Sequence, residues 1–75
     1  KNLTNNNKSC LIYEFIYNAM SSNGENIDFH EIILITGDYK QSIICTAIFP
    51  EMHYKLLHLI MKESLLSIDW KDSEL

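Results

Sequence analysis

The sequence contains no arginine, and its six lysines are outnumbered by ten acidic residues, which gives a net charge of −4. A surface that follows the phosphates of a nucleic acid needs clustered positive charge. The shortage of cations therefore disfavours extensive nucleic-acid binding, although it leaves room for a single basic helix on an acidic body.

Cysteine and glycine are also scarce, with two residues of each. Two cysteines cannot build the disulfide framework of a small secreted protein. Cys10 and Cys45 both lie among apolar residues, so we expect buried, reduced thiols, with one disulfide between them as the alternative. Gly24 and Gly37 are too far apart for a glycine-rich phosphate loop.

Long apolar runs are missing as well. No stretch approaches the roughly 18 uninterrupted apolar residues of a membrane-spanning helix, and no cleavage pattern of a signal peptide follows an apolar N-terminal core. The 75 residues are 47% hydrophobic and 21% charged, which is typical of a small folded domain. We therefore expect one soluble, cytoplasmic domain over residues 10–68, between a polar, flexible leader (residues 1–9) and a charged tail (residues 69–75).

Residues 10–21 predict a helix, because their apolar residues fall into two arcs at 100° per residue. Gly24, in the polar segment that follows, would end this helix. One arc contains Leu11, Ile12, Phe15, Ile16 and Ala19, and the other contains Cys10, Tyr13, Tyr17 and Met20.

Residues 27–50 allow two interpretations. The first, which we favour, is a β-hairpin, since two runs rich in β-branched residues flank a turn-forming segment at residues 37–40. The second is a helix-turn-helix, in which Asp28 caps the first helix, Gly37 ends it, and residues 38–49 form the second. This span resembles the second and third helices of a winged helix, but Ile33 is large where such motifs have a small residue, and Asp38 is polar where they bury an apolar one.

A last helix is predicted over residues 51–67, because Pro50 suits the start of a helix and Glu51 complements its dipole. A narrow polar stripe divides its apolar residues into two sides. We predict that one side, with Leu56, Leu59 and Ile60, forms the core, and that the other side faces a partner. The polar stripe contains Glu51, Lys55, His58 and Lys62, and the second apolar side contains Leu57, Met61 and Leu65.

No set of residues predicts a catalytic, metal or cofactor site. His53 and His58 are five residues apart, about 140° around a helix, so they cannot face one metal ion, and His30 adds no supporting spacing. A nucleophilic pair of Cys45 with a histidine would need a cleft that so short a chain hardly provides.

These observations predict an α+β fold, an α-β-β-α unit of helix, β-hairpin and helix, with an all-α helix-turn-helix fold as the alternative. The excess of apolar surface predicts a homodimer that also docks on a protein partner. We expect a non-enzymatic regulator, inhibitor or adapter, of the kind encoded by bacterial or phage accessory loci; the alternative is a small DNA-binding transcription regulator. The candidate interaction surface comprises Tyr13, Tyr17, Met20, Leu57, Met61 and Leu65.

Overall fold

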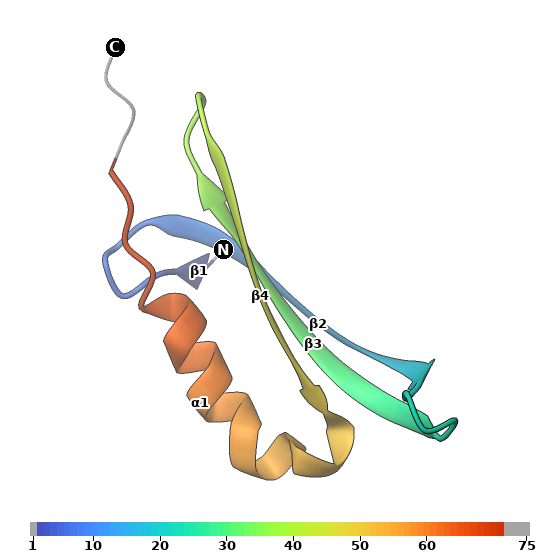
Figure 1. Ribbon diagram of the computed structural model, residues 1–75. Coiled ribbons are helices and arrows are strands. Elements are labelled where there is room, and N and C mark those ends of the chain that lie inside the picture. The colour runs from blue at the N-terminus through green and yellow to red at the C-terminus, as the bar shows by residue number, and fades with distance from the viewer. Residues whose placement is uncertain (1, 72–75) are drawn as a thin grey trace.

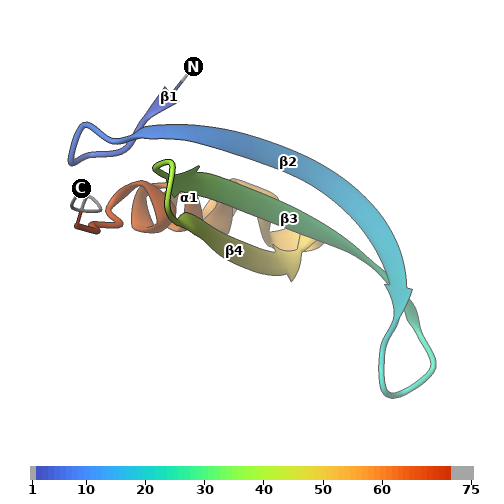
Figure 2. The same ribbon diagram turned by 90° about the horizontal axis from the view of Figure 1, so that it is seen from above.

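The computed structural model describes residues 2–71 and shows one antiparallel sheet with a helix against one of its faces (Figures 1 and 2). The strand order is β1-β2-β3-β4, which is also the order along the chain. The elements are β1 (Asn2–Leu3), β2 (Ser9–Met20), β3 (Asn26–Gly37), β4 (Ser42–Pro50), a 3₁₀ turn (Glu51–His53) and α1 (Tyr54–Leu66).

The predicted N-terminal helix is wrong, since residues 9–20 form the long strand β2. This strand pairs with β3 without interruption from Cys10 opposite Thr36 to Met20 opposite Asn26. A segment whose apolar residues form two arcs of a helix is also apolar on both faces of a strand. The helical periodicity therefore did not distinguish a helix from a strand. Aromatic and β-branched side chains pack well on a pleated surface, and pairing with the equally long β3 decides the outcome.

The hairpin interpretation of the middle segment is confirmed, and the all-α alternative with a helix-turn-helix is wrong. β3 and β4 pair from Gly37 opposite Ser42 to Phe29 opposite Pro50. Gly37 has a φ of +142°, and a Cβ there would lie 2.1 Å from the carbonyl oxygen of Gln41. Glycine is therefore required where the chain leaves β3, because any side chain would push the two arms of the turn apart.

The C-terminal helix is confirmed, as a 3₁₀ turn that continues into α1. It packs on the face of the sheet to which the even-numbered residues of β3 point. Ile32 and Leu34 are fully buried there, with Cys10 and Phe49 from the neighbouring strands beside them. The core thus lies between β3 and α1.

The prediction that Leu56, Leu59 and Ile60 form the core is wrong. These side chains are 60–69% exposed and lie on the outer side of α1. The side toward the sheet carries Tyr54, His58 and Lys62, since Tyr54 and Lys62 contact residues of β3 and β2. Apolar residues surround most of α1, so the sequence could not show which of its sides faces the sheet.

Hydrogen bonds join the N-terminal segment to the end of α1 and the segment after α1 to the β3–β4 turn. The amide of Asn5 donates to the carbonyl oxygen of Leu66 (2.8 Å), and the side-chain amide of Asn6 donates to that of Ile68 (2.9 Å). Gln41 donates from Nε2 to the carbonyl oxygen of Lys71 (2.8 Å). The predicted leader thus contains β1 and a turn that contacts the helix end, and residues 72–75 of the predicted tail lie outside the described residues.

Candidate interaction surface

The sheet face opposite α1 carries a continuous layer of large apolar side chains, which we call the open face. Figure 2 shows α1 on the other side of the sheet. Within residues 2–71 no element packs on the open face, and five of its apolar side chains are 43–66% exposed: Leu11, Tyr13, Phe15, Ile44 and Ile48. The register of the strands adds Tyr17, Phe29, Glu31, Ile33, Ile35 and Thr46 to the same face.

The strand register arranges this face in rows across β2, β3 and β4. Leu11, Ile35 and Ile44 form an aliphatic row at one end. Aromatic rings gather at the other end, where the ring centroid of Tyr17 lies 5.9 Å from that of Phe29 and 6.1 Å from that of Phe15.

The open face is large for a chain of this size. Nine residues of β4 at about 3.3 Å each make it roughly 30 Å long, and three strands make it roughly 14 Å wide. Its projected area is therefore about 400 Å², and the accessible area of the protruding side chains is greater. Apolar patches of about 300–600 Å² are the largest on typical monomers and often mark interaction sites.

Glu31 is the only charged residue in the rows of the open face. It lies on the central strand β3, between Phe15 of β2 and Ile48 of β4. Its side chain is partly exposed, and among the described residues no ion pair involves it. A carboxylate set in an apolar surface favours a binding partner that supplies a cation.

The structure places the predicted surface residues at three locations. Tyr13 and Tyr17 lie on the open face, two positions apart on a strand instead of one helical turn apart. Met20 ends β2 and is 69% exposed, on the opposite side of the sheet from the two tyrosines. Leu57, Met61 and Leu65 are partly buried on the side of α1 toward the sheet. The predicted surface is therefore not continuous.

Sequence reasoning missed most of the open face, including Phe15, Phe29, Ile33, Ile44 and Ile48. The sequence did contain an indication of this face, because in residues 10–20 every second position is a large apolar residue: Leu11, Tyr13, Phe15 and Tyr17. The even-numbered positions are also mostly apolar, which concealed that alternation.

A polar cluster joins the sheet to the helix on the covered face. His30 is buried, with Nδ1 2.8 Å from Oε1 of Glu51 and Nε2 3.1 Å from Oε1 of Glu14. Nζ of Lys62 lies 2.7 Å from Oε2 of Glu14. The imidazole ring stacks on Phe49, with centroids 5.2 Å apart, and lies at 4.6 Å from the ring of Tyr54. Because ionised carboxylates only accept hydrogen bonds, both contacts of the ring are satisfied together only by a doubly protonated imidazole.

The hydrogen bond from Lys62 lowers the pKa of Glu14, assisted by His30, and these contacts outweigh the opposing effect of burial. A carboxyl group whose pKa is lowered by folding stabilises the native state at pH values above its unfolded pKa. That contribution is lost as the pH falls through the native pKa. The cluster therefore stabilises the docking of α1 at neutral pH and weakens in acid.

We expect Lys62→Met to make Glu14 protonate at a higher pH than in the wild type, because the largest cause of the lowered pKa is removed. NMR titration of the Glu14 side-chain carbon between about pH 2 and 6 measures this directly, and Lys55→Met, at an exposed position of the same helix, is the control. An unchanged Glu14 titration in Lys62→Met would contradict the role assigned to the ion pair.

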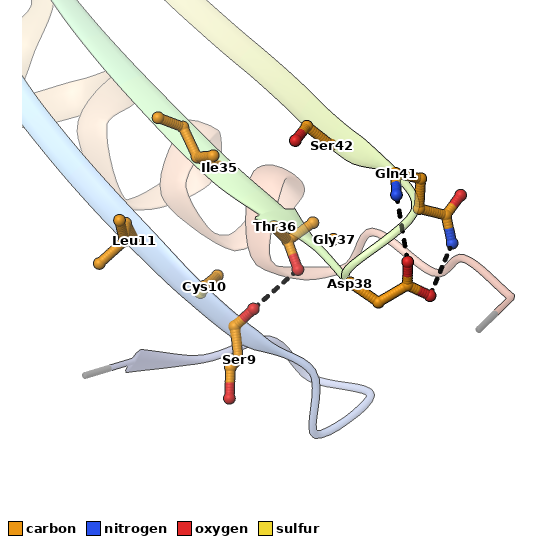
Figure 3. A pocket seen from close by; sticks show the side chains of 9 residues that line it. All are labelled: Ser9, Cys10, Leu11, Ile35, Thr36, Gly37, Asp38, Gln41 and Ser42. Carbon is orange, nitrogen blue, oxygen red and sulfur yellow. Dashed lines mark hydrogen bonds between the residues drawn. The ribbon is translucent and has the colours of Figure 1, made fainter. Parts of the chain in front are cut away.

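A shallow cavity of about 240 Å³ lies at the end of the sheet where β3 turns into β4 (Figure 3). At its floor the hydroxyl of Thr36 donates to the carbonyl oxygen of Ser9 (2.8 Å), and Asp38 accepts hydrogen bonds from Gln41. Burial raises the pKa of the Cys10 thiol, which is the opposite of what an activated nucleophile needs. The side chains of Thr36 and Asp38 are thus hydrogen-bonded to other residues of this cavity, and the bonds to Asp38 hold the turn.

The part of the chain that the structure describes lacks a metal-binding cluster, a disulfide and a membrane-spanning helix. Within residues 2–71, no group of three or more His, Cys, Asp or Glu side chains is arranged to hold a metal ion. In the same range, Cys10 and Cys45 are free thiols, and no helix has the length and apolarity needed to cross a bilayer. The open face is therefore the strongest candidate site. No protein-family model, curated protein or solved structure matches this chain.

Proposed function

We propose that this chain is a non-enzymatic interaction protein of the cytoplasm that acts as a homodimer and binds a partner protein through its open face. The observation that supports this most directly is the exposed apolar layer over β2, β3 and β4. Tyrosines at its edge supply large contact area with a polar tip, which is typical of protein-binding surfaces. A regulator, inhibitor or adapter is the class of protein that such a surface suits.

The charge on the open face indicates a partner protein with an apolar surface and at least one basic residue. Glu31 lies near the middle of the face, and none of the face residues is a cation. If two copies packed open face to open face, both Glu31 carboxylates would be buried without a counter-ion, which costs several kcal/mol. A lysine or arginine of a different protein removes that cost.

DNA binding has less support than protein binding. The segment that would form the helix-turn-helix is the β3–β4 hairpin. The exposed outer side of α1 carries Leu56, Leu59 and Ile60 in place of a row of cations, and Met52 in the preceding 3₁₀ turn is also exposed. Phosphate contacts need lysines or arginines gathered on one surface.

Photo-crosslinking from the open face tests the proposal. We expect benzoylphenylalanine at Tyr13, in cells that express the protein at its natural level, to give an adduct with a second protein. The same group at Tyr39, which is 69% exposed in the β3–β4 turn, should not give this adduct. Glu31→Lys should abolish the adduct, because it places a cation opposite the partner's cation, whereas Glu63→Lys, on the exposed side of α1, should leave it unchanged.

Two results would contradict partner binding at the open face. One is an adduct from Tyr13 that contains only two copies of the 8.8 kDa chain, since the open face would then be covered by the protein itself. The other is an adduct that forms equally from Tyr13 and Tyr39.

A further inference from the structure

The outer edge of β4 has unpaired backbone groups. The sheet order places β4 at the edge, and among residues 2–71 no strand lies beyond it. A row of free N–H and C=O groups along nine residues is a template for pairing with another strand. Figure 1 shows α1 below the face of the sheet, so the helix does not cover this edge.

The hydrogen bond at the turn shows which amides point outward. The amide of Asp38 donates to the carbonyl oxygen of Gln41 (2.9 Å), so Asp38 and Gln41 form a hydrogen-bonded pair of the antiparallel ladder. Bonded and non-bonded pairs alternate along an antiparallel ladder. The pairs of β3 with Ile44, Thr46 and Ile48 are therefore non-bonded, and the amides of these three residues face the free edge. Pro50, which has no N–H, occupies the next such position.

The sequence of β4 does nothing to prevent pairing along this edge. Natural edge strands commonly avoid association through lysines, inward-pointing charges, bulges or a proline within the strand. β4 contains no charged residue, its register with β3 is unbroken, and its proline is the last residue.

The other edge of the sheet, formed mainly by β2, is less suited to pairing with a second strand. Residues 11–20 of β2 extend beyond the two positions paired with β1. However, the Glu14–Lys62 ion pair lies along this edge, and β2 is strongly curved in Figure 2. A charged, curved strand is a poor template for a second strand. The free edge of β4 is therefore the favoured place for strand pairing.

We infer that β4 pairs antiparallel with β4 of a second copy, with Thr46 on the two-fold axis, so that two four-stranded sheets join into one. This inference rests on the proposed homodimer and specifies its interface. The register places Ile44 opposite Ile48 of the other copy, twice by symmetry, and Thr46 opposite Thr46. It forms about eight backbone hydrogen bonds, and pairs of β-branched residues are favourable cross-strand neighbours.

The alternative symmetric register centred on Cys45 forms as many hydrogen bonds but pairs Ser42 with Ile48, a less favourable cross-strand pair than two β-branched residues.

In either register the two helices lie on the same side of the joined sheet, because the two-fold axis of an antiparallel strand pair is perpendicular to the sheet. The two open faces then form one continuous surface, and the homodimer binds two partner surfaces, or one surface of twice the length.

The interface is tested with Thr46→Pro, which removes an outward N–H and leaves the bonds between β3 and β4 intact. Thr46→Ala keeps the amide and is the matched control. Sedimentation equilibrium should show wild type and Thr46→Ala as dimers of about twice the 8.8 kDa chain mass. Thr46→Pro should dissociate at least about 100-fold more readily while its circular dichroism spectrum stays that of the folded chain.

A cross-link tests the register even if the proline variant does not fold. In a Cys45→Ala background, dibromobimane should join two copies through Thr46→Cys, which lies on the axis. It should not join them through Ser42→Cys, because the two copies of that residue are about 27 Å apart in this register. A dimeric wild type whose Thr46→Cys variant gives no cross-link would overturn the edge pairing but not the homodimer, whereas a monomeric wild type would overturn both. A dimer that survives Thr46→Pro but is dissociated by Ile33→Lys would place the interface on the open face instead.

Discussion

Replacing Leu34 with alanine is expected to remove a large part of the free energy of unfolding of this protein. Leu34 is fully buried at the centre of β3, on the face covered by α1. Truncating a fully buried leucine costs about 2–5 kcal/mol, and the total stability of so small a domain is roughly 5 kcal/mol. Urea titration followed by circular dichroism measures the loss.

Leu59→Ala is the matched control, since it makes the same chemical change on a side chain that is 63% exposed. Its effect on the free energy of unfolding should stay within about 0.5 kcal/mol, as is usual for surface positions. If Leu59→Ala were the more damaging of the two substitutions, α1 would have to pack with its opposite side toward the sheet.

His30→Ala is expected to destabilise the protein as well, partly for an electrostatic reason and partly through lost packing. The ring lies between Glu14 and Glu51, with contacts of 3.1 and 2.8 Å, and packs on Phe49 and Tyr54. Its removal leaves two partly buried carboxylates without their shared partner and opens a cavity beside the core. Removing one partner of a fully buried ion pair costs about 3–5 kcal/mol. Because the side chains of Glu14 and Glu51 are 28% and 32% exposed, solvent screening makes the electrostatic loss smaller here, and the lost packing of the buried ring adds to it.

His53→Ala is the control for this substitution, because His53 is exposed in the 3₁₀ turn. Adding Glu51→Gln to the His30→Ala variant should restore part of the lost stability, since it removes one of the two carboxylate charges that have lost their partner. Thermal unfolding of the wild type, His30→Ala, His53→Ala and the double variant His30→Ala with Glu51→Gln tests this argument. Equal losses for His30→Ala and His53→Ala would show that the cluster does not stabilise the fold.

The elements predicted correctly from sequence are those with strong local signals. Gly37 and the polar residues after it mark the turn between β3 and β4, and Pro50 with Glu51 marks the start of the final helical segment. Each signal acts through the backbone of its own residues, by the positive φ of glycine or the fixed φ of proline. Such preferences do not depend on distant parts of the chain.

The sequence alone determined the acidic, arginine-free composition, the uncharged β4, the turn at Gly37 and the excess of apolar surface. The tertiary structure decided that residues 9–20 form a strand, because pairing with residues 26–37 outweighs a local pattern compatible with either state. It also decided which side of α1 is buried, since the contacts of Tyr54 and Lys62 with His30 and Glu14 select one side of a helix that is apolar nearly all round. The open face follows from both choices: only when β2, β3 and β4 lie side by side do residues as distant as Leu11 and Ile44 form one surface.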